Sequence, residues 1–127
     1  MSQNQSIEKA AMNEAVTYEA KRTGKSPNVI KKRLGYDLES GDRKIEVKGT
    51  KLLWKDFKSS YQVVTENERK NATHLYMVCN VLNKPDLHIF EMPKLHKALV
   101  PDLNYRLQFS RCRKDESDET SSEAKNP

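Results

Sequence analysis

Apolar residues near the start of the chain recur at the spacing of a helix. Four of them lie three or four positions apart and would share one face. They are Ile7, Ala11, Ala15 and Tyr18. Ser6 is a suitable N-cap, and Gly24 favours a stop because glycine readily adopts the left-handed conformation at a helix C-terminus. We therefore predict an amphipathic helix over residues 6–23, after a polar lead-in at residues 1–5.

After this helix the pattern becomes that of short strands. Residues 45–48 read Ile-Glu-Val-Lys, which alternates apolar and polar side chains, and the Ser-Gly-Asp at residues 40–42 is a natural hairpin turn. Residues 75–82 form a run that is apolar except for Asn80 and has the length of a buried central strand. Thr65 and Glu68 have the spacing of a capping box, which predicts the start of a short helix.

Weaker patterns complete the expected order of elements. Residues 25–34 are a basic connector, further strands are predicted at residues 61–65, 87–90 and 105–109 (the last at a sheet edge), and a helical turn at residues 93–99. Together these segments give the order α-β-β-β-α-β-β with small additions. That order predicts an α/β fold with a mixed sheet flanked by helices. The chain has 127 residues, which suits a single domain.

Charge is unevenly distributed along the chain. Residues 114–127 hold two lysines against five acids, a net charge of −3, while the whole chain carries +5. The remaining body, residues 1–113, therefore carries +8, which favours a polyanionic partner such as nucleic acid. A basic surface that serves solubility alone is the alternative. Because residues 114–127 have too few apolar side chains to fold, we predict a disordered acidic tail after a folded domain at residues 6–113.

Other features bear on location. The apolar runs are all shorter than the roughly 18–20 residues of a membrane helix, and the polar start is not typical of a signal peptide. Cys79 and Cys112 lack the spacing of a redox or metal-binding pair, and the three histidines lack zinc-ligand spacing. We therefore expect a protein of a reducing compartment that is not associated with a membrane, in the cytoplasm, nucleoid or nucleus.

The predicted hairpin would gather charged side chains on one face. Residues two apart in a strand point the same way, so Glu46 and Lys48 share a face at roughly 7 Å spacing, opposite Ile45 and Val47. Folding of the hairpin would bring Asp37 beside Glu46. Carboxylates ligate Mg²⁺ and an ammonium group offsets charge on a phosphate, so this set suits metal-assisted phosphate chemistry. The alternative is a solvated strand face that carries an ordinary ion pair.

The spacing Asp-x8-Glu-x-Lys is typical of the PD-(D/E)xK nuclease superfamily, and the surrounding sequence is more specific. Four blocks and a following apolar strand occur in the order of one family within it. The blocks are Ala11-Met12 with Tyr18-Glu19, Gly24 and Pro27; Gly35-Tyr36-Asp37-Leu38-Glu39-Ser40; Ile45-Glu46-Val47-Lys48-Gly49; and Val64-Thr65-Glu66-Asn67-Glu68. Over residues 7–81 the chain resembles the NO VEIN carboxy-terminal-like family, which is often appended to helicases and is related to Mrr-type restriction nucleases. The resemblance implies a restriction-endonuclease-like fold.

The resemblance also implies roles for the residues of the hairpin. Asp37 and Glu46 would ligate Mg²⁺ or Mn²⁺, and the backbone carbonyl of Val47 would complete the protein's share of the ligands. Lys48 would orient or help to deprotonate the attacking water and would stabilise charge in the transition state.

Acidic residues outside the hairpin are also candidates. By resemblance, Glu19 on the first helix would be an additional metal ligand, and Glu14 on the same helix is a rival for that role. The last family block contains Asn67 and Glu68, for which helix capping with Thr65 is a sufficient explanation without catalysis.

A basic segment with aromatic residues follows the hairpin. Its aromatic rings would stack on bases while its lysines bind phosphate, and the family has a loop near the active site here. The candidate nucleic-acid-binding residues are Lys51, Trp54, Lys55, Lys58 and, by family resemblance alone, Gln62. The alternative is that Trp54 and Phe57 fill the edge of the core.

Two functions from different classes agree with these features. The first is a Mg²⁺- or Mn²⁺-dependent nuclease that hydrolyses phosphodiester bonds, in DNA rather than RNA, with a role in defence or repair. The second is a non-catalytic nucleic-acid-binding module that retains the nuclease fold. A protein-interaction adaptor, whose acidic tail binds a basic partner, is a weaker third. A domain this small would need a homodimer or a helicase-type partner to make paired cuts.

Overall fold

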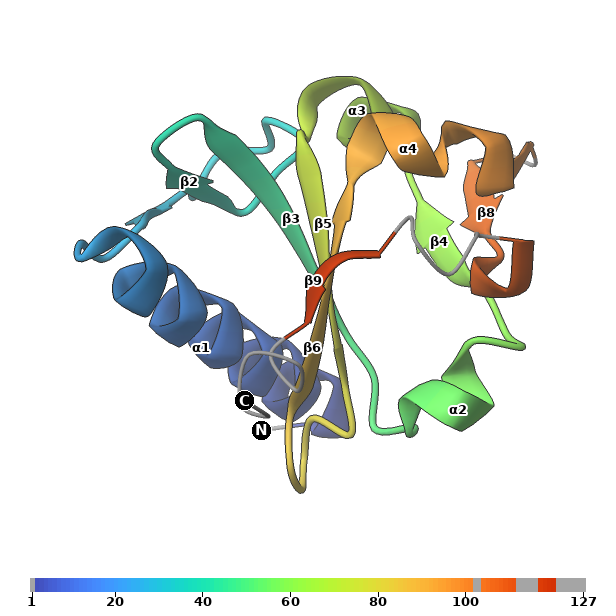
Figure 1. The fold of residues 1–127 in the computed structure, drawn as a ribbon, viewed down its shortest axis with the longest axis horizontal. Coiled ribbons are helices and arrows are strands. Elements are labelled where there is room, and N and C mark those ends of the chain that lie inside the picture. The colour runs from blue at the N-terminus through green and yellow to red at the C-terminus, as the bar shows by residue number, and fades with distance from the viewer. Residues whose placement is uncertain (1, 102–103, 112–116, 121–127) are drawn as a thin grey trace.

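The computed structural model describes residues 2–101, 104–111 and 117–120 (Figure 1). The helices are α1 (Gln3–Thr23), α2 (Trp54–Phe57), α3 (Glu66–Asn71) and α4 (Met92–Leu95), with 3₁₀ turns η1 (His96–Ala98) and η2 (Phe109–Arg111). The strands are β1 (Asn28–Val29), β2 (Leu38–Ser40), β3 (Arg43–Gly49), β4 (Gln62–Val64), β5 (His74–Cys79), β6 (Asp86–Glu91), β7 (Leu99–Pro101), β8 (Tyr105–Leu107) and β9 (Ser117–Thr120). These strands form two sheets with helices around them.

The larger sheet is mixed, which confirms the predicted fold class. Its strand order is β1-β2-β3-β5-β6-β9, in which β3 and β5 run parallel and every other neighbouring pair is antiparallel. Strand β5 lies in the interior of the sheet and is buried along almost its whole length, as the apolar run at residues 75–82 predicts. The predicted hairpin is formed by β2 and β3, with Gly41 in the left-handed region at its turn (φ 58°).

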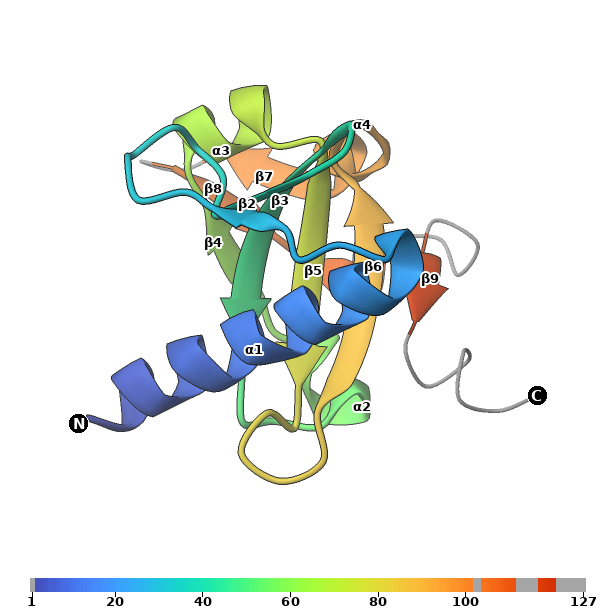
Figure 2. The ribbon, with the colours of Figure 1, turned by 90° about the vertical axis from the view of Figure 1, so that its left-hand side faces the viewer.

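Helix α1 covers one face of this sheet (Figures 1 and 2). Ala11 and Ala15 of α1 belong to one apolar cluster with Ile45 of β3 and Tyr76 of β5. The helix approaches so closely that a Cβ atom on Gly49 would lie 2.8 Å from the Cβ of Ala11, which requires glycine at the end of β3. Helix α1 therefore lies on the side of β3 to which the apolar side chains point.

The first helix begins earlier than the sequence predicts. Ser2 rather than Ser6 is its N-cap, because the Ser2 hydroxyl accepts from the N–H of Gln5 and the Gln5 side chain accepts from the N–H of Ser2. This capping box satisfies N–H groups that the helix end would otherwise leave unpaired, so most of the expected lead-in at residues 1–5 is helical. Gly24 ends the helix as predicted, with φ 78°. Among the helices of the described ranges, none combines the length and apolar character needed to cross a bilayer.

A small second sheet and helices α2, α3 and α4 lie on the opposite face (Figure 1). Its strand order is β4-β8-β7, with both pairs antiparallel. Met77 and Phe90 of the large sheet share a buried cluster with Val64 of β4 and Leu107 of β8. The predicted edge strand at residues 105–109 is therefore wrong in position, because β8 is the middle strand of this second sheet. Its neighbour β7 is too short to show a periodic pattern.

Part of the predicted acidic tail forms a strand. Ser117–Thr120 is β9, which pairs antiparallel with β6. Backbone pairing does not require apolar side chains, and it satisfies N–H and C=O groups that β6 would otherwise leave unpaired at the sheet edge. The expectation of disorder at residues 114–127 is therefore wrong for these residues. The rest of that segment, like Cys112, lies outside the described residues.

Candidate functional site

The hairpin holds Asp37 directly beside β3. The backbone N–H of Asp37 donates to the carbonyl of Ile45 over 2.8 Å, and the N–H of Val47 donates to Asp37 Oδ2 over 2.9 Å. Because the N–H and C=O of one strand residue point to the same edge, the Val47 carbonyl also faces the side on which Asp37 lies. The carboxyl groups of Asp37 and Glu46 are close enough that each influences the pKa of the other. The structure therefore brings together the two carboxyl groups that the hairpin is expected to gather.

Glu46 is a buried carboxyl group with other acids as neighbours. It exposes 6% of its surface and points to the face of β3 opposite α1. Burial is the main influence, and with the negative charges of Asp37 and Glu68 it outweighs the attraction of Lys48 and raises the pKa of Glu46 to about 9. The pKa of Asp37 is also raised, mainly by burial. Asp37 and Glu46 thus form a carboxyl cluster that retains a proton at neutral pH. A bound cation would favour the ionised form of this cluster.

Lys48 lies between two carboxyl groups. Its Nζ atom is 3.3 Å from Glu46 Oε2 and 3.2 Å from Glu68 Oε2. Burial alone would lower the pKa of Lys48, but the two acidic neighbours reverse this effect and raise the pKa above its ordinary value. The attraction of Glu46 is the larger of the two, and that of Glu68 follows it. Lys48 is therefore a fixed positive charge, suited to offsetting negative charge rather than to accepting a proton.

Glu68 joins this cluster from α3. The Thr65 hydroxyl accepts from the N–H of Glu68, and Glu68 Oε1 accepts from the N–H of Thr65, which confirms the predicted capping box. Glu68 Oε2 accepts from Lys48 Nζ. One carboxylate thus serves both the helix and the cluster, with one oxygen for each. The capping spacing reveals the first contact, but the second depends on which strand lies beside α3.

An open pocket of about 520 Å³ adjoins the carboxyl groups. Its lining combines the loop between β1 and β2, the carboxyl cluster and the start of α3. The lining residues are 30–36, Asp37, Glu46, Thr65, Asn67 and Glu68. The sequence interpretation treated this loop as a connector and missed its place at the site. The available signal was the run Lys31-Lys32-Arg33 just before the Gly35 block.

The cluster offers a small set of oxygen donors. Within the described ranges, no group of three or more His, Cys, Asp and Glu side chains is arranged to hold a metal ion. Asp37 and Glu46 line the pocket, and the backbone carbonyl of Val47, the next residue after Glu46, faces the side on which Asp37 lies. Mg²⁺ commonly binds one or two carboxylates and leaves its other positions to water and substrate phosphate. This donor set therefore fits Mg²⁺ or Mn²⁺ that binds together with a phosphate.

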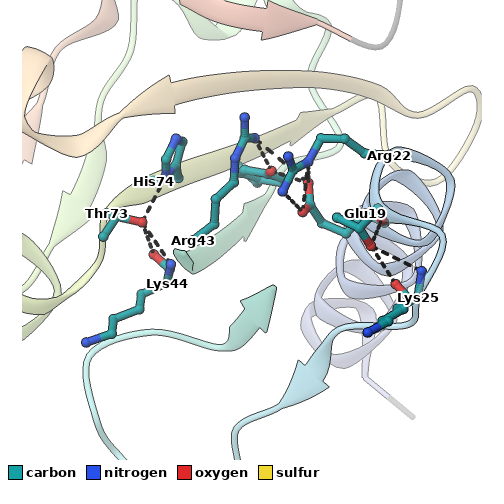
Figure 3. A network of polar contacts seen from close by, with 9 residues as sticks. Glu19, Arg22, Lys25, Arg43, Lys44, Thr73 and His74 are labelled. Atoms are coloured by element: carbon teal, nitrogen blue, oxygen red, sulfur yellow. Dashed lines mark hydrogen bonds and ion pairs between the residues drawn. The ribbon is translucent and has the colours of Figure 1, made fainter. Parts of the chain in front are cut away.

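Glu19 is not part of this cluster. It is fully buried on the face of the sheet that α1 covers, whereas Glu46 points to the other face. Figure 3 shows Arg22 and Arg43 directed toward the Glu19 carboxylate. Arg22 Nε donates to both carboxylate oxygens over 3.0 Å, and the Tyr76 hydroxyl donates to Oε2. The interpretation of Glu19 as a metal ligand is therefore corrected.

The physical reason lies in the packing of α1. Its apolar stripe must cover the apolar face of β3, so neither Glu19 nor its rival Glu14 reaches the charged face. Burial alone would raise the pKa of Glu19, but hydrogen bonds from Arg22, Tyr76 and Ser40 outweigh it and hold the pKa below its ordinary value. Glu19 is thus a satisfied, ionised group that connects α1 to the sheet.

The aromatic segment after β3 lies away from the carboxyl cluster. Figures 1 and 2 show α2 at the end of the large sheet opposite α3. The ring of Trp54 stacks on His88 with 4.2 Å between centroids and meets Phe109 edge-on at 5.2 Å, while Phe57 is buried. The structure therefore supports the core-edge alternative for both aromatic residues.

The other predicted nucleic-acid-binding residues are also outside the pocket lining. Lys51, Lys55 and Lys58 are exposed beside or on α2. Gln62 lies on β4, where its amide donates to the carbonyl of Val63 over 3.3 Å. The loop before β2, rather than this segment, supplies basic side chains at the carboxyl cluster.

Comparison with known proteins identifies the family. No curated protein and no solved structure matches this chain. The family model described as protein NO VEIN, C-terminal, matches residues 7–90, well over half of the chain. The matched region runs from α1 to β6 and includes every residue of the carboxyl cluster. The chain therefore belongs to the NO VEIN C-terminal family.

Proposed function

We propose that this protein is a metal-dependent nuclease of the PD-(D/E)xK type that hydrolyses phosphodiester bonds in DNA. The observation that carries the proposal is the pair formed by the half-buried Asp37 and the buried Glu46, with Lys48 beside it, at the edge of an open pocket. A solvated ion pair would leave Glu46 exposed, but this side chain is buried and carries a strongly raised pKa. Perturbed carboxyl groups of this kind are typical of catalytic and metal-binding sites.

Asp37 and Glu46, with the Val47 carbonyl, would hold Mg²⁺ or Mn²⁺. When bound, such an ion polarises a phosphate oxygen and lowers the pKa of an attacking water. The two carboxyl groups also repel each other in the absence of a cation, which favours ion binding over a purely structural role. The proposed metal site thus rests on the oxygen donors of these residues and on the repulsion between the two carboxyl groups.

Lys48 would stabilise negative charge on the phosphoryl group during hydrolysis. Its ammonium group is held by Glu68 and Glu46, and its raised pKa keeps it charged. A charged lysine cannot accept the proton of the attacking water, so charge stabilisation is favoured over general-base catalysis. Glu68 would act as a positioning residue that directs Lys48 toward the pocket.

The net charge of +8 on residues 1–113 supports a polyanionic substrate, and we favour DNA over RNA. A role in defence or repair, and paired cuts through a homodimer or a helicase-type partner, are part of the same proposal.

A cleavage assay tests this function. The protein and Glu46→Gln are incubated with single- and double-stranded DNA and RNA, with Mg²⁺ and Mn²⁺ in turn. We expect metal-dependent cleavage of DNA by the wild type and only background cleavage by the variant. A wild type that binds nucleic acid but cuts none of these substrates would instead establish the non-catalytic binding module.

A further inference from the structure

Three consecutive cationic residues line the same pocket as the acidic residues. Lys31, Lys32 and Arg33 are exposed and belong to the pocket lining together with Asp37 and Glu46. None of the three side chains makes an ion pair or hydrogen bond to another described residue. Their charges are therefore available to a ligand in the pocket.

The loop that carries these cations is fixed to the rest of the site. At its base, the N–H of Ile30 donates to the carbonyl of Asp37 over 2.9 Å. At its end, Gly35 has φ 90° and lies so close to α3 that a Cβ atom would be 2.5 Å from the carbonyl oxygen of Asn67. Only glycine fits this contact. The cations are thus presented from a loop that is attached to the Asp37 hairpin and to the helix of Glu68.

The arrangement of charge in the pocket matches a chain of phosphates. One phosphate beside Asp37 and Glu46 can share a divalent cation with those carboxyl groups. Three adjacent free cations exceed what that single phosphate requires, but they suit the neighbouring phosphates of the same strand. A mononucleotide or phosphomonoester would leave them unused.

We propose that residues 31–33 bind the phosphate backbone next to the phosphodiester being cut, so that the substrate is a polynucleotide strand. This inference rests on the proposed nuclease function, which identifies the pocket as the substrate site. It assigns the nucleic-acid-binding role to the loop before β2 in place of the lysines around α2. Those lysines lie at the opposite end of the sheet from α3 (Figures 1 and 2).

Binding measurements on full-length protein test this assignment separately from catalysis. The test variant is Lys31→Ala/Lys32→Ala/Arg33→Ala. The matched control is Lys9→Ala/Lys21→Ala/Lys25→Ala, which removes the same charge from exposed positions on and just after α1. The probes are a short labelled DNA duplex and its single strand, with divalent cations chelated so that no cleavage occurs. Affinity is measured over a series of salt concentrations, and circular dichroism verifies that both variants are folded.

The loop variant should bind roughly tenfold or more weakly at low salt, and its salt dependence should be shallower by about 2–3 in log–log slope on duplex DNA. The control should keep the wild-type slope to within about one unit. Equal losses in both variants, wild-type affinity in the loop variant, or no DNA binding by the wild type would each overturn the assignment. If the loop variant loses affinity but the wild type cuts no substrate, the assignment stands and the nuclease proposal fails. If the wild type cuts DNA and the loop variant binds DNA as tightly as the wild type, the nuclease proposal stands and the assignment of residues 31–33 fails.

Discussion

Strand β3 separates two buried glutamates that have opposite surroundings. Glu19 lies on the α1 side, where Arg22, Tyr76 and Ser40 donate hydrogen bonds to it and hold its pKa below the ordinary value. Glu46 lies on the other side, where burial and the charge of Asp37 contribute to raising its pKa to about 9. Both side chains are almost inaccessible to solvent.

The surroundings of the two acids explain why Glu19 suits a structural role and Glu46 suits the binding of a cation. A buried carboxylate that is fully paired with donors has no need for another ligand, and removing it leaves its buried partners unpaired at a cost in stability. A buried carboxyl group beside a second one is destabilised in its charged form, and it gains most from a bound cation. The surroundings of a buried acid therefore indicate its role better than its burial does.

The largest expected effect comes from removing the carboxyl groups of the pocket. Asp37→Ala and Glu46→Ala should each abolish Mn²⁺ binding, measured by titration calorimetry, and reduce cleavage to background, because two carboxylates are needed to hold the ion. Glu19→Gln is the matched control from the other face and should keep both properties. Loss of metal binding in a folded Glu19→Gln protein would reverse the comparison.

Removing the ammonium group should affect catalysis alone. Lys48→Ala should lower kcat by about 10²–10³-fold, because the group stabilises charge in the transition state, and it should leave Mn²⁺ affinity largely unchanged. Lys9→Ala, on the exposed side of α1, controls for the loss of one charge. A parallel loss of metal affinity would show that Lys48 organises the ligands instead.

On the α1 side, the expected effect is on stability. Glu19→Gln should lower the free energy of unfolding by roughly 2–3 kcal/mol, because it weakens the buried hydrogen bonds to Arg22 and Tyr76. Since the folded-state pKa of Glu19 is lowered, this contribution is present above pH 4.5 and is lost as the pH falls below it. Denaturant titration at several pH values measures both effects. Glu14→Gln on the same helix should change stability little.

A third position distinguishes packing from binding on the pocket side of the sheet. Trp54→Ala should lower the free energy of unfolding by about 2–3 kcal/mol, because the half-buried ring packs on His88 and Phe109. DNA affinity of the folded variant should stay at the wild-type value. A selective loss of DNA affinity without a change in stability would show that Trp54 belongs to the DNA-binding surface.

The smallest expected effect is a gain in stability rather than a loss. Glu46→Gln should raise the free energy of unfolding at pH 7 without metal, by roughly 1–3 kcal/mol. The folded-state pKa of Glu46 lies near 9, above its unfolded value of 4.5. Its contribution is therefore fully present below pH 4.5 and declines as the pH rises toward 9. Wild-type stability should fall over this window more steeply than that of the variant, and Mn²⁺ should stabilise only the wild type. A destabilised Glu46→Gln protein would contradict the difference between the two acids.

Features that depend on neighbours a few positions away were predictable from the sequence. The stop of α1 at Gly24 and the turn at Gly41 follow from the backbone freedom of glycine. The shared face of Glu46 and Lys48 follows from the two-residue period of a strand, and the capping box follows from the three-residue spacing of Thr65 and Glu68. The fold class and the pairing of Asp37 with Glu46 were predictable from the same local rules.

Which surfaces meet depends on how distant elements pack, and local patterns do not reveal it. The position of Glu19 depends on the face of β3 that α1 covers, although the apolar side chains of Ile45 and Val47 already indicated that face. The contact between Glu68 and Lys48, and the place of residues 30–36 in the pocket, depend on where α3 packs. The second sheet and β9 likewise arise from backbone pairing between distant segments. Such pairing satisfies N–H and C=O groups that carry no side-chain pattern, so local periodicity cannot reveal it.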